Sequence, residues 1–336
     1  MSLLKIFFNY KRRKTSLISL PVRLWIETSS ACNLKCVMCL NKAMPSSKKG
    51  VMNFNLFKKI IDEAKDYVYD VYLHHRGEPL LHPELPQMIE YAKRAGLKVK
   101  FHTNGTLMNP ELSRRILEAG PDLISFSVDG FTKETYEKIR VNADFDATMN
   151  YISDFLKYKK EHGFRKPYTV IEEIEFPEYQ NPADEKNRKN FSEHFRKLGL
   201  DEMILKKLYN WAGYLDTGTS GQGERTYTMC TFLWYSAVIF WDGNVSPCPQ
   251  DYYGKIRLGN VKDKPLREIW NGADYISLRK QMLSGVEELS PCNKCDRLFR
   301  KKVAGIPFQY LISYLNDNVI GYGKLRKILG SYERNE

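Results

Sequence analysis

The sequence predicts an α/β fold, with six strand–helix units in an open, partial barrel and a small domain after it. Short runs rich in β-branched and aromatic residues alternate with amphipathic runs between residues 22 and 207. Such alternation is typical of parallel strands joined by right-handed crossovers through outer helices. Beyond residue 207 the alternation stops, and four of the seven cysteines lie there.

The barrel elements follow one another with clear boundaries. Strands are expected at residues 22–29, 67–75, 97–104, 123–129, 168–176 and 202–207. Helices are expected at residues 53–66, 82–96, 109–120, 146–163 and 183–199. Several of these helical runs begin at Asn or Asp and end at Gly, which are start and stop signals. Six units are too few for a closed eight-stranded barrel, so we expect a partial (β/α)6 TIM barrel with its active site at the C-terminal strand ends.

Changes in composition set the expected domain limits. They are a basic N-terminal extension at 1–21, the barrel at 22–207, a second domain at 208–300 and a C-terminal extension at 301–336. Within the last two we expect a loop at 209–229, a hairpin at 232–248 that turns at its Asp-Gly pair, a helix at 265–285 and a helical tail at 306–336.

The charge balance favours anionic partners. Lys and Arg total 52 against 40 Asp and Glu, a net charge of +12. Only the KRRK run at 11–14 is dense, and with the apolar residues before it this segment could contact a membrane surface, although a solvated terminus is the simpler interpretation. No apolar run approaches the roughly 18–20 residues of a membrane helix, and the N-terminus lacks the layout of a signal peptide. We therefore expect a cytoplasmic protein.

The seven cysteines form two groups, and in a reducing compartment they are not expected to form disulfides. The first group has the spacing C-x3-C-x2-C directly after the first expected strand, and the second group follows residue 229. The groups are Cys32, Cys36 and Cys39, then Cys230, Cys248, Cys292 and Cys295. Three thiolates leave a position open, as catalytic metal sites do. Four thiolates satisfy either a zinc site or a fully ligated iron–sulfur cluster, and the ligand count does not separate the two.

The first cysteine loop, placed after the first strand of a six-unit barrel, resembles the radical S-adenosylmethionine (radical SAM) superfamily. In that family three cysteines hold a [4Fe–4S] cluster whose open iron binds S-adenosylmethionine. Reductive cleavage then gives a 5′-deoxyadenosyl radical that abstracts hydrogen from a substrate. The resemblance implies S-adenosylmethionine as cofactor and a reductase such as flavodoxin or ferredoxin as partner.

The RGEP segment at 76–79 resembles the family's Gly-Gly-Glu-Pro motif, with Arg76 in place of the first Gly. By that match Gly77 allows close backbone approach. Glu78 would accept a hydrogen bond from the ammonium group of S-adenosylmethionine, a charge-assisted contact. The alternative for Glu78 is a helix N-cap, which we consider weaker because Pro79 and a loop follow.

Two further segments match the family in the right order. A Thr-Asn-Gly turn ends the third expected strand and puts Asn104 near the cofactor. After the fourth strand, Ser127 and Arg140 match residues that bind the cofactor's carboxylate, while Asp129 and Gly130 shape the turn. Taken singly, Arg140 would more often be a surface charge.

The stretch 241–271, together with the second cysteine group, resembles the SPASM/twitch domains attached to radical SAM barrels. Full SPASM domains carry seven cysteines and two auxiliary clusters. Because no cysteine follows Cys295, the resemblance is to the shorter twitch type of aminocyclitol dehydrogenases, with one auxiliary cluster. The chain is thus expected to bind two [4Fe–4S] clusters, one for S-adenosylmethionine and one auxiliary.

The resemblance implies an oxidoreductase for a polar or anionic small molecule. The radical would abstract hydrogen from a carbinol carbon of a sugar, aminocyclitol or nucleotide-linked substrate, with oxidation through the auxiliary cluster. The alternatives are a carbohydrate epimerase and a peptide or protein maturase, and many maturases carry an N-terminal leader-binding domain that the 21 residues before the first strand are too short to form. Nucleic acid is not expected as a partner, because a zinc-bearing nucleic-acid binder would leave the Gly-Glu-Pro and Thr-Asn-Gly loops without a role.

No single residue stands out as the general base. Sulfatase-maturing relatives carry an acid directly after the cysteine that matches Cys248, where this chain has Pro249. The candidates are Asp251, Glu173, Glu175, His102 and Tyr209. Each also has a structural explanation.

Overall fold

The computed structural model describes residues 2–176, 178–179, 182–216, 229–298, 302–303 and 306–307. Within these residues one eight-stranded sheet has the order β6-β5-β4-β3-β2-β1-β7-β8. Its strands are β1 (Arg23–Ile26), β2 (Asp70–Tyr72), β3 (Lys98–Thr103), β4 (Leu123–Ser127), β5 (Tyr168–Ile174), β6 (Glu202–Lys206), β7 (Ser236–Ile239) and β8 (Val245–Ser246). All neighbours from β6 to β7 are parallel, and β7 and β8 are antiparallel.

The six expected barrel strands are confirmed, each shorter than its expected range. The helices between them are α2 (Phe54–Ala64), α3 (Leu85–Arg94), α4 (Pro110–Ala119), α5 (Lys133–Ile139), α6 (Phe145–Glu161) and α7 (Pro182–Lys197). Asn53, Asn109 and Asp144 cap their helices by accepting hydrogen bonds from first-turn amides. The helix α5 has no counterpart among the expected runs, because seven residues are too few to show a helical period.

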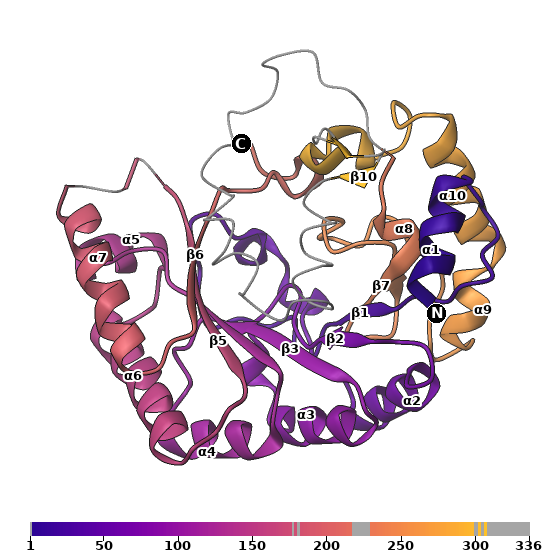
Figure 1. The fold of residues 1–336 in the computed structure, drawn as a ribbon. Coiled ribbons are helices and arrows are strands. Elements are labelled where there is room, and N and C mark those ends of the chain that lie inside the picture. Colours follow the sequence, from indigo (N-terminus) through magenta and orange to yellow (C-terminus); the bar gives the residue numbers. More distant parts are fainter. Residues whose placement is uncertain are drawn as a thin grey trace.

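Side-chain alternation along the strands divides the sheet into two faces. Leu24, Val71, Val99, Ile124 and Ile171 are fully buried in one hydrophobic core with the helices. Figure 1 shows the helices along the convex side of the curved sheet, which confirms the partial barrel. Many of the alternate positions carry polar side chains, among them Lys100, His102 and Glu172, so the concave face is where chemistry can take place.

The second domain continues the barrel sheet. Its elements are α8 (Phe232–Tyr235), β7, β8, α9 (Leu266–Trp270) and α10 (Ala273–Ser284). Because β7 pairs in parallel with β1, the sheet crosses the expected limit at 207, and the domain limits remain a proposal. The expected hairpin is present and turns at Gly243 with φ of +90°, but its first residues form the helical turn α8. The expected helix at 265–285 is divided at Asn271 and Gly272.

The N-terminal extension forms α1 (Ser2–Lys11), which packs against α8. Ile6 and Tyr10 are buried, the Tyr10 ring lies 5.6 Å from that of Trp234, and its hydroxyl donates to the Met229 carbonyl at 2.8 Å. Phe7 and Phe8 are exposed, so membrane-surface contact remains a proposal for this segment.

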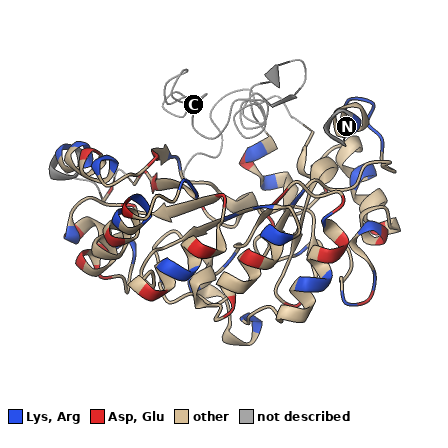
Figure 2. Cartoon of the chain, turned by 60° about the horizontal axis from the view of Figure 1, so that its bottom comes forward, with Lys and Arg blue, Asp and Glu red and all other residues tan. Residues whose placement is uncertain are grey.

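Charges of both signs are mixed over the outer helices on the face that Figure 2 shows. Among the described helices, none is long and apolar enough to cross a bilayer. A short pair of strands, β9 (Lys302–Val303) and β10 (Ile306–Pro307), follows the second domain. Most of the expected tail at 306–336 and the middle of the expected loop at 209–229 lie outside the described residues.

Candidate functional site

The first cysteine group lies in an irregular loop between β1 and α2. Backbone amides of Lys35 and Val37 donate to the carbonyls of Val141 and Ile139, which fixes the loop against the end of α5. Burial raises the pKa of Cys32 to about 12 and that of Cys36 to about 11. The positive charge of Arg140 partly opposes the rise at Cys36. Thiolates in these surroundings need a cationic partner, which a bound metal would supply.

The 76–79 loop lies directly against the start of the cysteine loop. The Glu78 amide donates to the Ala31 carbonyl at 2.8 Å. A Cβ atom at Gly77 would lie 2.3 Å from the Ala31 oxygen and 2.5 Å from the Ser29 oxygen. No side chain fits there, so the close approach expected of Gly77 is present in the structure.

The Glu78 carboxylate is buried and accepts three hydrogen bonds. They come from the Leu80 amide at 3.0 Å, the Thr103 hydroxyl at 2.7 Å and the Asn104 amide at 2.8 Å. Burial raises the pKa of Glu78, and these hydrogen bonds oppose the shift. Glu78 is also the N-cap of a single 3-10 turn, Pro79–Leu81. The N-cap role, which we considered the weaker interpretation, is therefore present in the structure. A carboxylate has about four acceptor positions, and one is left for a ligand.

Asn104 joins the turn after β3 to the cysteine loop. Its side-chain amide donates to the Asn33 oxygen at 3.0 Å, and Asn33 in turn donates to the Thr106 hydroxyl at 2.8 Å. The Asn104 oxygen accepts from the Thr106 amide and hydroxyl. Asn33 and Thr106 were not singled out in the sequence, because neither belongs to a motif.

Arg140 is buried at the end of α5 and forms an ion pair with Asp129 at 2.5 Å. The carboxylate holds the pKa of Arg140 above its usual range although burial opposes this. One guanidinium nitrogen lies 4.0 Å from the Cys36 sulfur, and Nε is buried with no hydrogen-bond partner in the described structure. Arg140 is thus not a surface charge, and Nε can donate to a ligand. Ser127, half-buried, ends the neighbouring strand β4.

The second cysteine group converges on one pocket. Cys230, Cys248, Cys292 and Cys295 all line it, and its volume is about 490 Å³ with the open mouth included. Burial and the neighbouring thiols raise the pKa values of the first three of these cysteines, that of Cys230 to about 12. No group of three His, Cys, Asp or Glu side chains in the described residues is arranged around a single metal ion.

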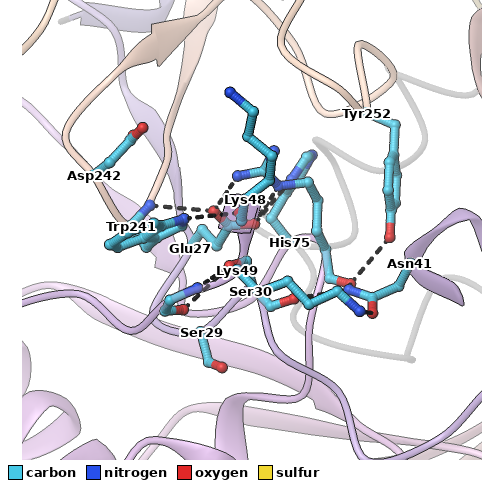
Figure 3. A network of polar contacts seen from close by, with 12 residues as sticks. Glu27, Ser29, Ser30, Asn41, Lys48, Lys49, His75, Trp241, Asp242 and Tyr252 are labelled. Atoms are coloured by element: carbon cyan, nitrogen blue, oxygen red, sulfur yellow. Dashed lines mark hydrogen bonds and ion pairs between the residues drawn. The ribbon is translucent and has the colours of Figure 1, made fainter. Parts of the chain in front are cut away.

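A buried network centred on Glu27 joins the barrel to the second domain (Figure 3). Arg76, which stands where the motif has Gly, binds both Glu27 oxygens at 2.5 and 2.6 Å and lies 4.1 Å above the Phe240 ring. The Trp241 amide donates to Glu27 at 3.2 Å. Burial opposes ionisation of Glu27, but the hydrogen bonds and positive charge of Arg76 outweigh it and lower the pKa of Glu27 to about 2.

Comparison with known proteins gives the family. A model described as the radical SAM superfamily matches residues 26–171, and a model of the SPASM iron–sulfur cluster-binding domain matches residues 230–296. The chain is 33% identical over 331 residues to Fe-coproporphyrin III synthase of Methanosarcina barkeri, covering 84% of this chain and 80% of that protein. This chain belongs to the radical SAM superfamily.

Other relatives and solved structures agree with this family and fold. A tungsten-containing aldehyde ferredoxin oxidoreductase cofactor-modifying protein of Pyrococcus furiosus is 28% identical over 76% of this chain and 82% of its own. The structure of BtrN in complex with AdoMet and 2-DOIA has a TM-score of 0.54 at 20% identity, covering 83% of this chain and 94% of that one. SuiB of Streptococcus suis, bound to its precursor peptide SuiA, has a TM-score of 0.63 at 15% identity, covering 90% and 78%.

Radical SAM proteins with a SPASM domain use S-adenosylmethionine and [4Fe–4S] clusters, and these are the cofactors of this chain. Its residues fit them. Arg140 Nε has no partner in the described structure, Glu78 has an acceptor position left, and Gly77 leaves no room for a side chain beside the cysteine loop. The family also indicates that this radical SAM protein is an enzyme.

Two of the five candidate bases, Asp251 and Glu173, are engaged in structural contacts. Asp251 accepts from two backbone amides and from the hydroxyls of Tyr214 and Ser246, so it shapes the loop after Cys248. Glu173 has a pKa raised by burial to about 7, but it lies on the helix-covered face and pairs with Arg188 of α7. Glu175 and Tyr209 are half-buried, and the Tyr209 ring lies 4.2 Å from the Arg297 guanidinium.

His102 lies on the concave face in a cluster of polar side chains. Its Nδ1 is 3.3 Å from Glu172, which also pairs with Lys206 at 2.8 Å. Its ring stacks on His74 at 4.3 Å, and its amide donates to His74 Nδ1 at 3.2 Å. Burial opposes ionisation of Glu172, but His102 and Lys206 outweigh it and hold its pKa well below the usual range. Burial and His102 lower the pKa of His74. Of this cluster, only His102 was singled out as a candidate from its place in the sequence.

Proposed function

We propose that this radical SAM protein is an oxidoreductase for a polar small molecule. The observation that carries the proposal is the convergence of four thiols on one pocket, a complete ligand set for an auxiliary [4Fe–4S] cluster. Cys32, Cys36 and Cys39 would hold the first cluster. When bound, the cofactors supply a 5′-deoxyadenosyl radical that takes hydrogen from a carbinol carbon and an auxiliary acceptor for the remaining electron.

The chain's own residues would bind and orient S-adenosylmethionine. The acceptor position left on Glu78 suits an ammonium group, and Arg140 Nε and Ser127 suit a carboxylate. Asn104 would act indirectly, because its side chain is engaged in holding the cysteine loop to the turn after β3. Gly77 permits the approach of the two loops.

His102 is the base that the geometry supports best. With Nδ1 held by Glu172, Nε2 is the nitrogen that can accept the hydroxyl proton of a carbinol, and the carboxylate stabilises the imidazolium that results. Lys206 and His74 lie around it and can bind polar or anionic groups of the substrate. Removal of one hydrogen atom, one proton and one electron converts the carbinol to a ketone.

We propose two small-molecule substrate classes. A sugar, aminocyclitol or nucleotide-linked substrate provides the carbinol carbon. A cofactor precursor is the second class, because relatives that match 76% and 84% of the chain are named for modifying or making cofactors. A peptide substrate has less support, since the mycofactocin maturase of Mycobacterium tuberculosis matches only 38% of the chain. All seven cysteines are assigned to clusters, which disfavours an epimerase with a cysteine hydrogen donor.

The first test is the iron and sulfide content of anaerobically reconstituted protein, with low-temperature electron paramagnetic resonance. We expect about eight irons per chain, falling to about four in a Cys32/Cys36/Cys39→Ala variant and to about four in a Cys230/Cys248/Cys292/Cys295→Ala variant. S-adenosylmethionine should perturb the spectrum only where the first group is intact. Stoichiometric zinc at the second group would remove the electron acceptor and refute the proposed oxidation.

The second test separates oxidation from epimerisation on members of the two substrate classes. The reaction is run in deuterated water with flavodoxin or ferredoxin as reductant. A ketone product supports oxidation. Deuterium retained at a non-exchangeable carbon of an unoxidised product would show epimerisation instead.

A further inference from the structure

Tyr252 lies between the two groups of cysteines. It follows Cys248 by four residues and is only 2% exposed. Its hydroxyl is 3.8 Å from the Cys39 sulfur of the first group and 3.1 Å from the Arg76 carbonyl. A side chain of the SPASM domain thus reaches a cysteine of the barrel.

The surroundings hold this tyrosine in place from both domains. Asp251 beside it accepts four hydrogen bonds, and His75 Nε2 lies 3.0 Å from the Pro249 carbonyl next to Cys248. The rings of Trp211 and His75 pack on the tyrosine ring. Figure 3 shows its hydroxyl directed at the loop that carries Asn41. The position of the hydroxyl is therefore fixed, which limits the groups that it can contact.

The single proton of the phenol has two acceptors within reach. The Arg76 carbonyl already accepts from Asn41 Nδ2 at 2.8 Å, so it stays satisfied without Tyr252. Cys39, as an iron ligand, would be a thiolate with no proton to donate and a negative charge to attract one. In the cluster-bound protein the stronger acceptor is therefore the sulfur.

We propose that Tyr252 donates a hydrogen bond to the Cys39 sulfur and thereby raises the reduction potential of the first cluster. Reduction adds negative charge, which a hydrogen bond to a ligand sulfur stabilises. Tyr252 is a positioning residue in this role, and it makes the SPASM domain part of the environment of the radical-generating site. The inference rests on the proposed role of Cys39 as a cluster ligand.

The test is a redox titration of reconstituted protein followed by electron paramagnetic resonance. In Tyr252→Phe the ratio of reduced to oxidised first cluster at a fixed potential should fall about two- to tenfold, the range expected for one lost hydrogen bond. The matched control is Tyr253→Phe. Tyr253 is adjacent, but its hydroxyl contacts the Leu40 carbonyl at 3.5 Å, so its removal should leave the ratio unchanged.

A second measurement uses only the wild-type protein and does not depend on a variant assembling its clusters. After exchange into deuterated water, the hyperfine spectrum of the reduced first cluster is expected to show a strongly coupled deuteron in addition to those of the Asn41 and Leu34 amides, which donate to Cys39 and Cys32. Absence of that deuteron, an unchanged ratio in Tyr252→Phe, or an equal fall in both variants would overturn the inference. Failure of wild-type protein to bind iron at Cys39 would instead refute the proposed function, so the two failures are distinct.

Discussion

At the scale of single residues, the loop at 76–79 shows how one motif combines structural and chemical roles. Gly77 is required because the chain at Ser29 and Ala31 comes too close for any side chain. Glu78 caps a helical turn, fixes the turn after β3 and keeps an acceptor position for a ligand. Arg76 departs from the family motif, and the structure gives the reason, since its guanidinium pairs with buried Glu27.

Replacing Gly77 with Ala should prevent assembly of the first cluster. The added methyl group would overlap the backbone of the cysteine loop and displace it. We expect iron content to fall by about four per chain. Gly163→Ala is the control, because a Cβ there meets nothing within 4 Å, and its φ of +69° adds only about 1–2 kcal/mol of local backbone strain away from the cysteine loops. Full iron content in Gly77→Ala would mean that the loop tolerates the displacement.

Replacing His102 with Asn should reduce product formation by about 100-fold or more, the usual effect of a lost general base. Cluster content and uncoupled release of 5′-deoxyadenosine should persist, because His102 contacts neither cysteine group in the described structure. Glu172→Gln should give a smaller loss. The control is Glu173→Gln, on the opposite face of the same strand. If only the Glu173→Gln control lost product formation, Glu173 and not His102 would be the general base.

At the scale of elements, β1 is the meeting point of the two domains. It pairs in parallel with β2 on one side and with β7 on the other. Just beyond its end, Glu27 binds Arg76 of the loop after β2 and the Trp241 amide of the β7–β8 hairpin. One buried carboxylate thus connects three elements.

Replacing Glu27 with Gln should lower the free energy of unfolding of the metal-free protein by about 3–5 kcal/mol at pH 7, because Arg76 would be left buried without a counter-charge. The folded pKa of Glu27 is about 2, below its ordinary value of 4.5, so its contribution is present above about pH 4.5 and is lost as the pH falls towards 2. The difference between wild type and variant should therefore shrink in acid.

Denaturant titrations at several pH values measure this difference. The control is Glu118→Gln, which removes an exposed partner of Arg114 and should cost under about 1 kcal/mol. If both variants lose the same stability, the network around Glu27 has no special role.

Elements with a long periodic pattern could be predicted from sequence, and pairings between distant segments could not. The six barrel strands and their long helices have clear periods and caps, whereas α5 and α8 are too short to show a period, and the break between α9 and α10 was not expected. No pattern in the sequence of β1 or of β7 indicates that these two strands pair. At the candidate site, the spacing of the cysteines and the Gly-Glu-Pro motif indicated cluster and cofactor loops. The polar cluster was missed because only register decides that Glu172, and not Glu173, faces His102.

At the scale of the whole molecule, the N-terminal helix supports the second cysteine group. The Tyr10 hydroxyl bonds to Met229, the residue before Cys230, and Trp234 donates to the Lys14 carbonyl at 2.9 Å. Helix α1 therefore contacts Met229 and Trp234, on either side of Cys230 in the sequence, although the helix and this cysteine are far apart in the chain.

Deleting residues 1–14 should weaken binding of the second cluster and lower the melting temperature. The deletion exposes Trp234 and removes the hydrogen bond that holds Met229, the residue before Cys230. Iron content measured in the Cys32/Cys36/Cys39→Ala background should fall below about four per chain. Unchanged iron content would show that α1 is dispensable for this site.

Because β1 pairs with a strand on each side, neither domain is expected to be stable as a separate fragment. A chain ending at residue 207 would leave the backbone groups of Arg23–Ile26 open along one side, in the middle of what is now a continuous sheet. Open strand edges recruit other strands, so such a fragment would be prone to self-association. Exchange of this SPASM domain for another would accordingly have to supply a strand that matches β1.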